Sequence, residues 1–407
     1  MVRRWMSLSA GTFLIIASAL FLITTNCTDV SAKETIKFGC AICFTGKDSL
    51  TGKLYVDSYN LAKEKINKKG GIKVGEKRYP IEIIYYDDKS DDTESAKLVN
   101  KLITEDGIDF LLGPYSSEIT LSAGAVAEKH RVPMVQGGGA VRNIFKRKNK
   151  YVFGTLPAAD QYFTTTLEMM TTFHPKPKRI AVVFEEDLFH TQVAEGVKKT
   201  VEKIGLKIVL YEKISETAAE FSTIFTKIKS LSPDALLISC HTTCAINLIQ
   251  QAKEQNVRLK MLSMTEAASE ANLKESLGKY REYIFGVASW SPRTNFNGVI
   301  FKDTKGFIDL FKEKYGYDPD YHNASAVAVL SVFKNAIEAA GTLDRKKVRN
   351  AIAETDLETI YGVIKFNPDG RIKGSSLVLQ VQGGEIYQVY PKGLKVPVYP
   401  MPDWKDR

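Results

Sequence analysis

Histidine, cysteine and tryptophan are scarce in this sequence: its 407 residues include five histidines, five cysteines and three tryptophans. The histidines are scattered, and no H-E-x-x-H, G-x-S-x-G or G-x-x-x-x-G-K-[ST] pattern occurs. Gly137-Gly138-Gly139 follows an apolar segment, but Arg142 stands where a dinucleotide-binding loop would need its last glycine. No hydrolase, kinase or dehydrogenase hypothesis therefore has support, and we predict a non-enzymatic protein without cofactor or metal.

The sequence also lacks a cluster of basic residues. Its 56 Lys and Arg against 47 Asp and Glu give a net charge of +9, but the excess is spread along the chain, so we predict no nucleic-acid partner. With 44% hydrophobic and 25% charged residues, the chain has the composition of a folded globular protein. Its length is sufficient for two or three domains of roughly 100–200 residues.

Long apolar runs are absent after the first thirty residues. Arg3 and Arg4 precede an uncharged stretch from Trp5 to Thr28, which is typical of a secretory signal. Its most apolar part, Phe13 to Ile23, is short for a membrane span of roughly 20 apolar residues. We expect residues 1–32 to be a signal peptide cleaved after Ala32, which predicts a periplasmic or other extracytoplasmic location. A lipoprotein with its lipid anchor at Cys27 is the alternative.

Four cysteines follow Ala32, and export makes disulfides possible. Cys40 and Cys240 lie in apolar segments, so we expect buried free thiols. A disulfide involving Cys43 or Cys244 and a metal site with His241 remain alternatives.

The chain alternates between apolar strands and amphipathic helices. Such a pattern is typical of parallel sheets covered on both faces. The expected strands are 36–42, 81–86, 109–112, 132–135, 179–184, 207–211, 235–239 and 260–263. The expected helices are 54–67, 93–105, 117–129, 190–204, 220–230 and 244–255. We infer two similar α/β units.

Three segments pair an aromatic residue with glycine: 152–155, 284–288 and 360–364. Glycine in extended chain often marks a bend, so we interpret them as crossings between two lobes. The predicted domains are residues 33–154 with 288–362 for lobe 1, 155–287 with 363–395 for lobe 2, and a C-terminal tail at 396–407.

Candidate binding residues follow the strands, because ligands of open parallel sheets bind outside the carboxyl ends of the strands. Ser116 and Ser117 start a helix, and hydroxyls with free N–H groups there bind anions such as a carboxylate. The Gly137–Gly139 run would add further N–H groups. Glu266 ends another strand and would hold an ammonium group. Plain roles as a helix cap and a solvated acid are the alternatives for these residues.

The sequence resembles the leucine/isoleucine/valine-binding family, the substrate-binding proteins of branched-chain amino acid ABC transporters. The similarity runs from about Thr35 to Pro400, and its motifs share one order and spacing. They are Thr45-Gly46, Asn67-Lys-Lys-Gly-Gly71, Tyr86-Asp-Asp88, Gly113-Pro-Tyr-Ser-Ser117, Pro177-Lys-Arg-Ile-Ala181 and Phe311-Lys-Glu-Lys-Tyr-Gly316. The resemblance implies the type I periplasmic-binding fold, with two Rossmann-like parallel-sheet lobes joined by three crossover segments.

The resemblance also implies roles for individual residues. Ser117, with Ser116 and the backbone of Gly138 and Gly139, would hold the α-carboxylate of the ligand, and Glu266 its α-ammonium. Ala140 replaces a family threonine that touches the carboxylate. Family aromatics of the pocket correspond to Thr51, Phe189 and His241, and Trp290 would close over the ligand or pack at a hinge.

The sequence thus predicts an exported solute-binding protein that delivers an amino acid or related small carboxylate to an ABC transporter permease. Its only contact with the membrane would be by docking or by the lipid anchor. A ligand-sensing receptor of the same fold is the alternative. An exported hydrolase or redox protein using His241 with Cys240 or Cys244 is a third class.

Overall fold

A computed structural model describes residues 34–145, 149–265 and 271–407, without the side chains of 271 and 272. Residues Thr35–Arg407 form one compact unit. The predicted signal peptide, Cys27 and Glu266 lie outside the described residues, so the expectations for them stay predictions.

The first sheet has five parallel strands in the order β4-β1-β5-β6-β7. Its central strands are almost wholly buried, because helices from both sides cover an apolar parallel sheet. The strands are β1 (Ile36–Ile42), β4 (Ile81–Asp87), β5 (Phe110–Leu112), β6 (Met134–Gln136) and β7 (Val152–Gly154). The helices between them are α1 (Ser49–Lys68), α2 (Asp92–Thr104) and α3 (Ser117–His130), and β2 (Ile72–Val74) pairs with β3 (Lys77–Tyr79).

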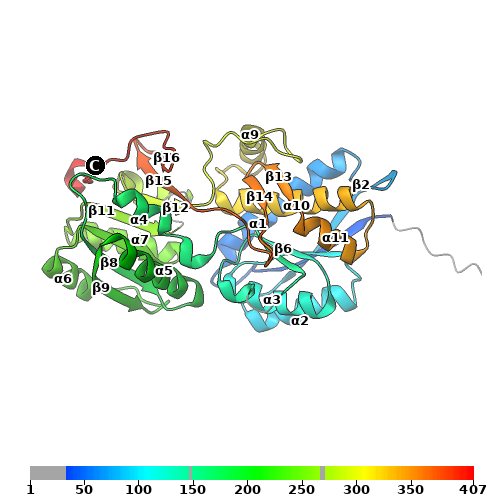
Figure 1. Ribbon diagram of the computed structural model, residues 1–407, viewed down its shortest axis with the longest axis horizontal. Coiled ribbons are helices and arrows are strands. Elements are labelled where there is room, and N and C mark those ends of the chain that lie inside the picture. Colours follow the sequence, from blue (N-terminus) through cyan, green and yellow to red (C-terminus); the bar gives the residue numbers. More distant parts are fainter. Residues whose placement is uncertain (1–33, 146–148, 266–270) are drawn as a thin grey trace, which may run out of the picture. The chain divides into compact units, whose positions relative to one another are not determined.

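The second sheet has seven strands in the order β16-β15-β12-β11-β10-β8-β9 (Figure 1). Its parallel strands are β8 (Arg179–Glu185), β9 (Lys207–Ile214), β10 (Ala235–Ser239), β11 (Met261–Thr265) and β12 (Phe285–Ala288). Two antiparallel strands, β15 (Leu377–Gln382) and β16 (Glu385–Tyr390), extend it beside β12. The accompanying helices are α4 (Thr164–Met170), α5 (Leu188–Ile204), α6 (Ser222–Leu231), α7 (Thr242–Glu254) and α8 (Ala271–Leu277).

The two sheets repeat one topology. In each, the first strand of the unit lies between the second and the third, followed by the fourth and fifth. The prediction of two similar parallel α/β units is therefore confirmed.

Between β12 and β15 the chain adds three helices and a hairpin: α9 (Thr304–Tyr315), α10 (Tyr321–Ala340), α11 (Arg345–Ala353), β13 (Asp356–Thr359) and β14 (Gly362–Lys365). Helix α10 is largely buried and packs on α1. In the described part of the chain, no single helix is long and apolar enough to cross a membrane. The pair α10 and α11, bent by 115°, passes that test together, by length and composition only.

The three glycine segments are regular strands and a hairpin, which corrects the interpretation that they are themselves crossings. Residues 152–154 form the edge strand β7, and 285–288 form β12 inside the second sheet. Residues 360–364 turn the β13–β14 hairpin. The connections between the sheets follow these segments. The end of β7 contacts the connection that follows β14, where the Gly154 N–H donates to Gly370 O. Glycine is compatible with both roles, so the pattern could not separate a strand from the connection after it.

Cys40, Cys43, Cys240 and Cys244 are buried, and no disulfide joins them, as expected. Burial raises the pKa of the Cys40 thiol, and the nearby Asp88 raises it further. Cys40 is therefore protonated and serves as a small apolar side chain.

The C-terminal residues pack on the segment between α7 and β11. Trp404 is buried in a short 3₁₀ helix (Trp404–Asp406), and its Nε1–H donates to Val257 O at 2.9 Å. The lobe boundaries drawn from the sequence remain a prediction.

Candidate functional site

Each sheet contains two neighbouring strands from whose carboxyl ends the chain continues in opposite directions along the sheet. The point of divergence lies between β1 and β5 in the first sheet and between β8 and β10 in the second. Loops diverge there and leave a crevice at the carboxyl ends of the strands, where open α/β sheets bind ligands. The residues directly after these four strands are therefore the candidates for a site.

A cavity collects residues from both of these points. Six predicted residues line it: Ser116, Ser117, Gly138, Ala140, Phe189 and His241. Five further residues, which the sequence did not single out, complete the lining: Tyr115, Glu118, Leu156, Tyr162 and Tyr321.

The N-terminus of α3 forms one wall. Ser116 is its N-cap residue but makes no capping hydrogen bond with its side chain, so the first N–H groups of the helix have no side-chain cap. Ser117 is buried beside them, and its Oγ accepts from the Ala140 N–H at 3.1 Å. That geometry leaves the Ser117 hydroxyl hydrogen available for an acceptor in the cavity. This wall is suited to an anionic group.

The glycine run does not supply the N–H groups that the sequence analysis expected. The N–H groups of Gly138 and Gly139 both donate to Oε1 of Gln136, at 3.0 and 2.7 Å. A Cβ on Gly138 would lie 2.3 Å from Pro114 O, so glycine is required for close packing with the loop after β5. The run therefore shapes the cavity wall, and Gly139 itself does not line the cavity.

Much of the cavity lining is aromatic. Phe189 contacts Tyr162 edge-on with ring centroids 5.1 Å apart, and Tyr115 and Tyr321 also line the cavity. Only Phe189 among these four was expected, and Tyr162 and Tyr321 come from segments that sequence spacing does not bring together. The cavity thus combines an anion-binding helix end with a large apolar surface.

Glu118 is an acidic residue of the cavity that the sequence analysis passed over. Its Oε1 accepts from the Leu188 N–H at 2.8 Å, and its Oε2 accepts from the Ser116 hydroxyl at 3.3 Å. The first bond joins α3 to the start of α5, that is, a segment of the first sheet to a segment of the second. A carboxylate on the second residue of a helix was visible in the sequence, but its partner is 70 residues away.

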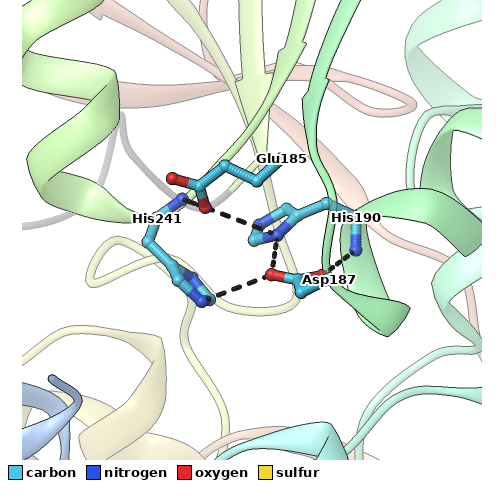
Figure 2. Close-up of side chains that lie close together, drawn as sticks. All are labelled: Glu185, Asp187, His190 and His241. Carbon is cyan, nitrogen blue, oxygen red and sulfur yellow. Dashed lines mark hydrogen bonds and ion pairs between the residues drawn. The ribbon is translucent and has the colours of Figure 1, made fainter. Parts of the chain in front are cut away.

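His241 lies against three buried ionisable residues, Glu185, Asp187 and His190 (Figure 2). Its backbone N–H donates to Glu185 Oε2 at 2.8 Å, and its Nε2 lies 3.4 Å from Asp187 Oδ2. Burial lowers the pKa of His241, and the nearby His190 lowers it further, so the ring is neutral near pH 7.

Comparison with known proteins identifies the family. A model of the periplasmic binding protein family matches residues 35–385. The chain belongs to that family.

A leucine-, isoleucine-, valine-, threonine- and alanine-binding protein of Pseudomonas aeruginosa is 26% identical over 344 residues, covering 84% of this chain and 88% of that protein. The solved structure of a branched-chain amino acid transporter substrate-binding protein from Streptococcus pneumoniae, in complex with isoleucine, has a TM-score of 0.75 at 21% identity. It covers 86% of this chain and 97% of its own.

A third similar structure is an ABC transporter solute-binding protein of Rhodopseudomonas palustris in complex with 3,4-dihydroxybenzoic acid. Its TM-score is 0.77 at 19% identity, and the match covers 90% of this chain and 99% of that one. These matches confirm the resemblance to Leu/Ile/Val-binding proteins and the two-lobed α/β fold class. The family consists of substrate-binding proteins and not of enzymes.

Two predicted site residues are not among those that line the cavity, and their roles in binding stay predictions. Thr51 was expected in a loop, but α1 begins at Ser49 and places it in the first helical turn. In the sequence, Gly52 is typical of a loop, so the start of the helix was predicted after it. It is helical instead, and a Cβ there would lie 2.0 Å from Cys43 O, so the glycine permits close packing of α1 on the chain after β1.

Trp290 is buried and packs edge-on against Phe307, and its Nε1–H donates to Ile360 O at 2.9 Å. It is not among the residues that line the cavity. The packing alternative therefore describes Trp290 in this binding protein, because its only polar atom already holds the β13–β14 hairpin.

Proposed function

We propose that this protein is an exported solute-binding protein that captures an amino acid or a related small carboxylate and delivers it to an ABC importer. The observation that carries the proposal is the N-terminus of α3: it lacks a side-chain cap and lines the cavity with Ser116 and Ser117. A helix N-terminus attracts negative charge through its N–H groups and its dipole.

The ligand's carboxylate is proposed to bind the α3 N–H groups and the Ser117 hydroxyl. Ser117 is well placed because the Ala140 N–H occupies its oxygen, so the hydroxyl hydrogen is directed elsewhere. The backbone of Gly138 and the small side chain of Ala140 leave room for the carboxylate.

The body of the ligand is proposed to lie against the aromatic residues of the lining, Tyr115, Tyr162, Phe189 and Tyr321. Such a surface accommodates a branched aliphatic or an aromatic group through apolar burial, at roughly 25 cal/mol per Å². Similar proteins named for branched-chain amino acids and complexed with an aromatic acid support this range of ligands.

An ammonium group, where the ligand has one, has two proposed partners. Glu266 was assigned this role from the family resemblance and lies outside the described residues. Glu118 lines the cavity with a carboxylate held by the Leu188 N–H. A ligand without an ammonium group, such as an aromatic acid, would need neither.

The proposal is tested by isothermal titration of the purified protein with leucine, phenylalanine, benzoate and the matched amine isobutylamine. We expect at least one carboxylate to bind and the amine not to bind. Ser117→Ala should weaken carboxylate binding about tenfold or more, because a hydrogen bond to a charged group contributes roughly 1.5–3 kcal/mol.

Ser122→Ala is the matched control. Ser122 lies in the same helix, but its hydroxyl donates to the exposed Asp92 at 2.9 Å. Its variant should bind like the wild type. Equal binding by the Ser117 and Ser122 variants would remove the α3 N-terminus from the site, and conversion of any ligand to product would refute a pure binding role.

A further inference from the structure

The polar group beside the cavity has the composition of a metal site. Glu185, Asp187, His190 and His241 each offer one ligand atom, and these four atoms all lie within 4.8 Å of one another. Two imidazole nitrogens and two carboxylate oxygens form a donor set that proteins use for Zn²⁺ and related divalent transition metals.

The distances approach those of a four-coordinate ion. Bonds of about 2.0–2.2 Å in a tetrahedron separate the ligand atoms by about 3.3–3.6 Å. Asp187 Oδ2 lies 3.4 Å from His241 Nε2, and His190 Nδ1 lies 3.7 Å from Glu185 Oε2. The pair His190 Nδ1 and Asp187 Oδ2 is closer, at 2.5 Å, so these two atoms would separate by about 1 Å to bind the same ion.

Hydrogen bonds from backbone N–H groups hold the two carboxylates of the cluster in place. Asp187 is the N-cap of α5, and its Oδ1 accepts from the His190 N–H at 2.7 Å, which leaves Oδ2 facing both rings (Figure 2). The His241 N–H fixes Glu185 at the end of β8. Ligand atoms fixed by helix caps and strand ends require little rearrangement to bind an ion.

The charge of the cluster favours a cation. Glu185 and Asp187 have side chains that are 2% and 5% exposed, and within the described residues their ion pairs are to the two histidines and not to any Lys or Arg. Buried carboxylates need a compensating positive charge, which a divalent ion bound by both carboxylates and both imidazoles would supply.

An ion can also reach the cluster. His241 is 28% exposed and lines the cavity, whereas the other three side chains lie behind it. We propose that Glu185, Asp187, His190 and His241 form a site for a divalent transition metal of the zinc class, set in the wall of the ligand cavity. This site does not depend on the proposed carboxylate site, although the two share the cavity.

The test is isothermal titration with ZnCl₂ of chelator-treated protein purified without a histidine tag. We expect one Zn²⁺ per chain and a raised melting temperature. Asp187→Asn and His241→Ala should each weaken binding by more than about 100-fold, since even an outer partner of a ligand contributes about 10- to 100-fold. Asparagine caps helices as well as aspartate, so Asp187→Asn tests the ligand while keeping the fold.

His130→Ala is the control, because His130 contacts Asn100 far from the cluster and its loss should leave Zn²⁺ binding unchanged. Ser117→Ala should also bind Zn²⁺ normally, which separates this proposal from the carboxylate site. The proposal is overturned if wild-type protein binds no stoichiometric Zn²⁺, if the Asp187 and His241 variants bind it like the wild type, or if Mg²⁺ and Ca²⁺ bind equally well.

Discussion

At the scale of single residues, some residues that line the cavity could be predicted from the sequence, whereas the way the lining is completed could not. Ser116 and Ser117 were identified because they follow a strand, and strand ends are a local property of the chain. Phe189 and His241 were identified from the family resemblance. Tyr162 and Tyr321 were missed because their place in the cavity depends on how distant segments pack. The hydrogen-bond acceptor of the Gly138 and Gly139 N–H groups was also not predicted. It is the side chain of Gln136, which folds back onto them.

Asp88 is a residue whose burial predicts a pH dependence of stability. It is fully buried, and its Oδ1 accepts from the Ser90 N–H at 3.0 Å. Burial raises the pKa of Asp88 to about 7, and it raises the pKa of Asp48 to about 6. The folded state therefore keeps protons that the unfolded state releases near pH 4. The free energy of unfolding should fall as the pH rises from about 4 to about 7.

Asp88→Asn removes one of these ionisations and keeps an acceptor for Ser90. We expect the variant to be more stable than the wild type at pH 8, on the order of 2 kcal/mol, and its stability to depend less on pH. Urea unfolding at pH 5 and pH 8 measures both, with the exposed Glu76→Gln as control. A variant that is less stable than the wild type at pH 8 would show that the Asp88 charge is compensated in the folded state.

At the scale of helices and strands, the parallel core was predictable, and the later part of the chain was not. Strands 36–42 and 235–239 were predicted at their observed bounds, because apolar runs in covered parallel sheets have sharp ends. The C-terminal hairpins were missed. Strand β16 is only partly buried and shows no continuous apolar run, and strand β13 has the polar sequence Asp-Leu-Glu-Thr.

Asn323 shows how one helix fixes another. Its Oδ1 accepts from the Asp320 N–H at 2.9 Å as part of the capping box of α10. Its Nδ2 donates to Leu54 O at 2.8 Å and to the Ser58 hydroxyl at 3.0 Å, both in α1. One side chain therefore caps α10 and ties it to α1.

Asn323→Ala should lower the free energy of unfolding by on the order of 3 kcal/mol, since it leaves buried polar groups without partners. Urea unfolding followed by circular dichroism gives the value. Asn350→Ala, at an exposed position of α11, should change stability by no more than about 0.5 kcal/mol. Similar losses in the two variants would mean that the Asn323 contacts do not stabilise the fold.

At the scale of the whole molecule, the sequence predicted two α/β units, and the repeated strand order confirms them. It could not predict which side chains join the two units, because those contacts link loops far apart in the chain. Besides the bond from Leu188 to Glu118, Lys47 after β1 forms an ion pair at 2.6 Å with Glu216 after β9. Both ion-pair side chains are partly exposed.

We propose that the protein opens and closes around its ligand, and such a contact then bears on ligand binding. An interaction made only in the closed form adds its free energy to the apparent affinity without contacting the ligand. Lys47→Ala should therefore weaken binding of the carboxylate identified by titration by up to about fivefold, the range of an exposed ion pair. The effect should shrink at high salt, which screens exposed charges.

Lys305→Ala is the matched control, because its ion pair with Asp309 lies within α9. Titration at about 0.05 and 0.5 M NaCl should show a salt-dependent loss of affinity for the Lys47 variant alone, with both melting temperatures near that of the wild type. If both variants bind like the wild type at low salt, the Lys47–Glu216 pair does not favour the ligand-bound form, and closure must be stabilised through the ligand and the Glu118 bond instead.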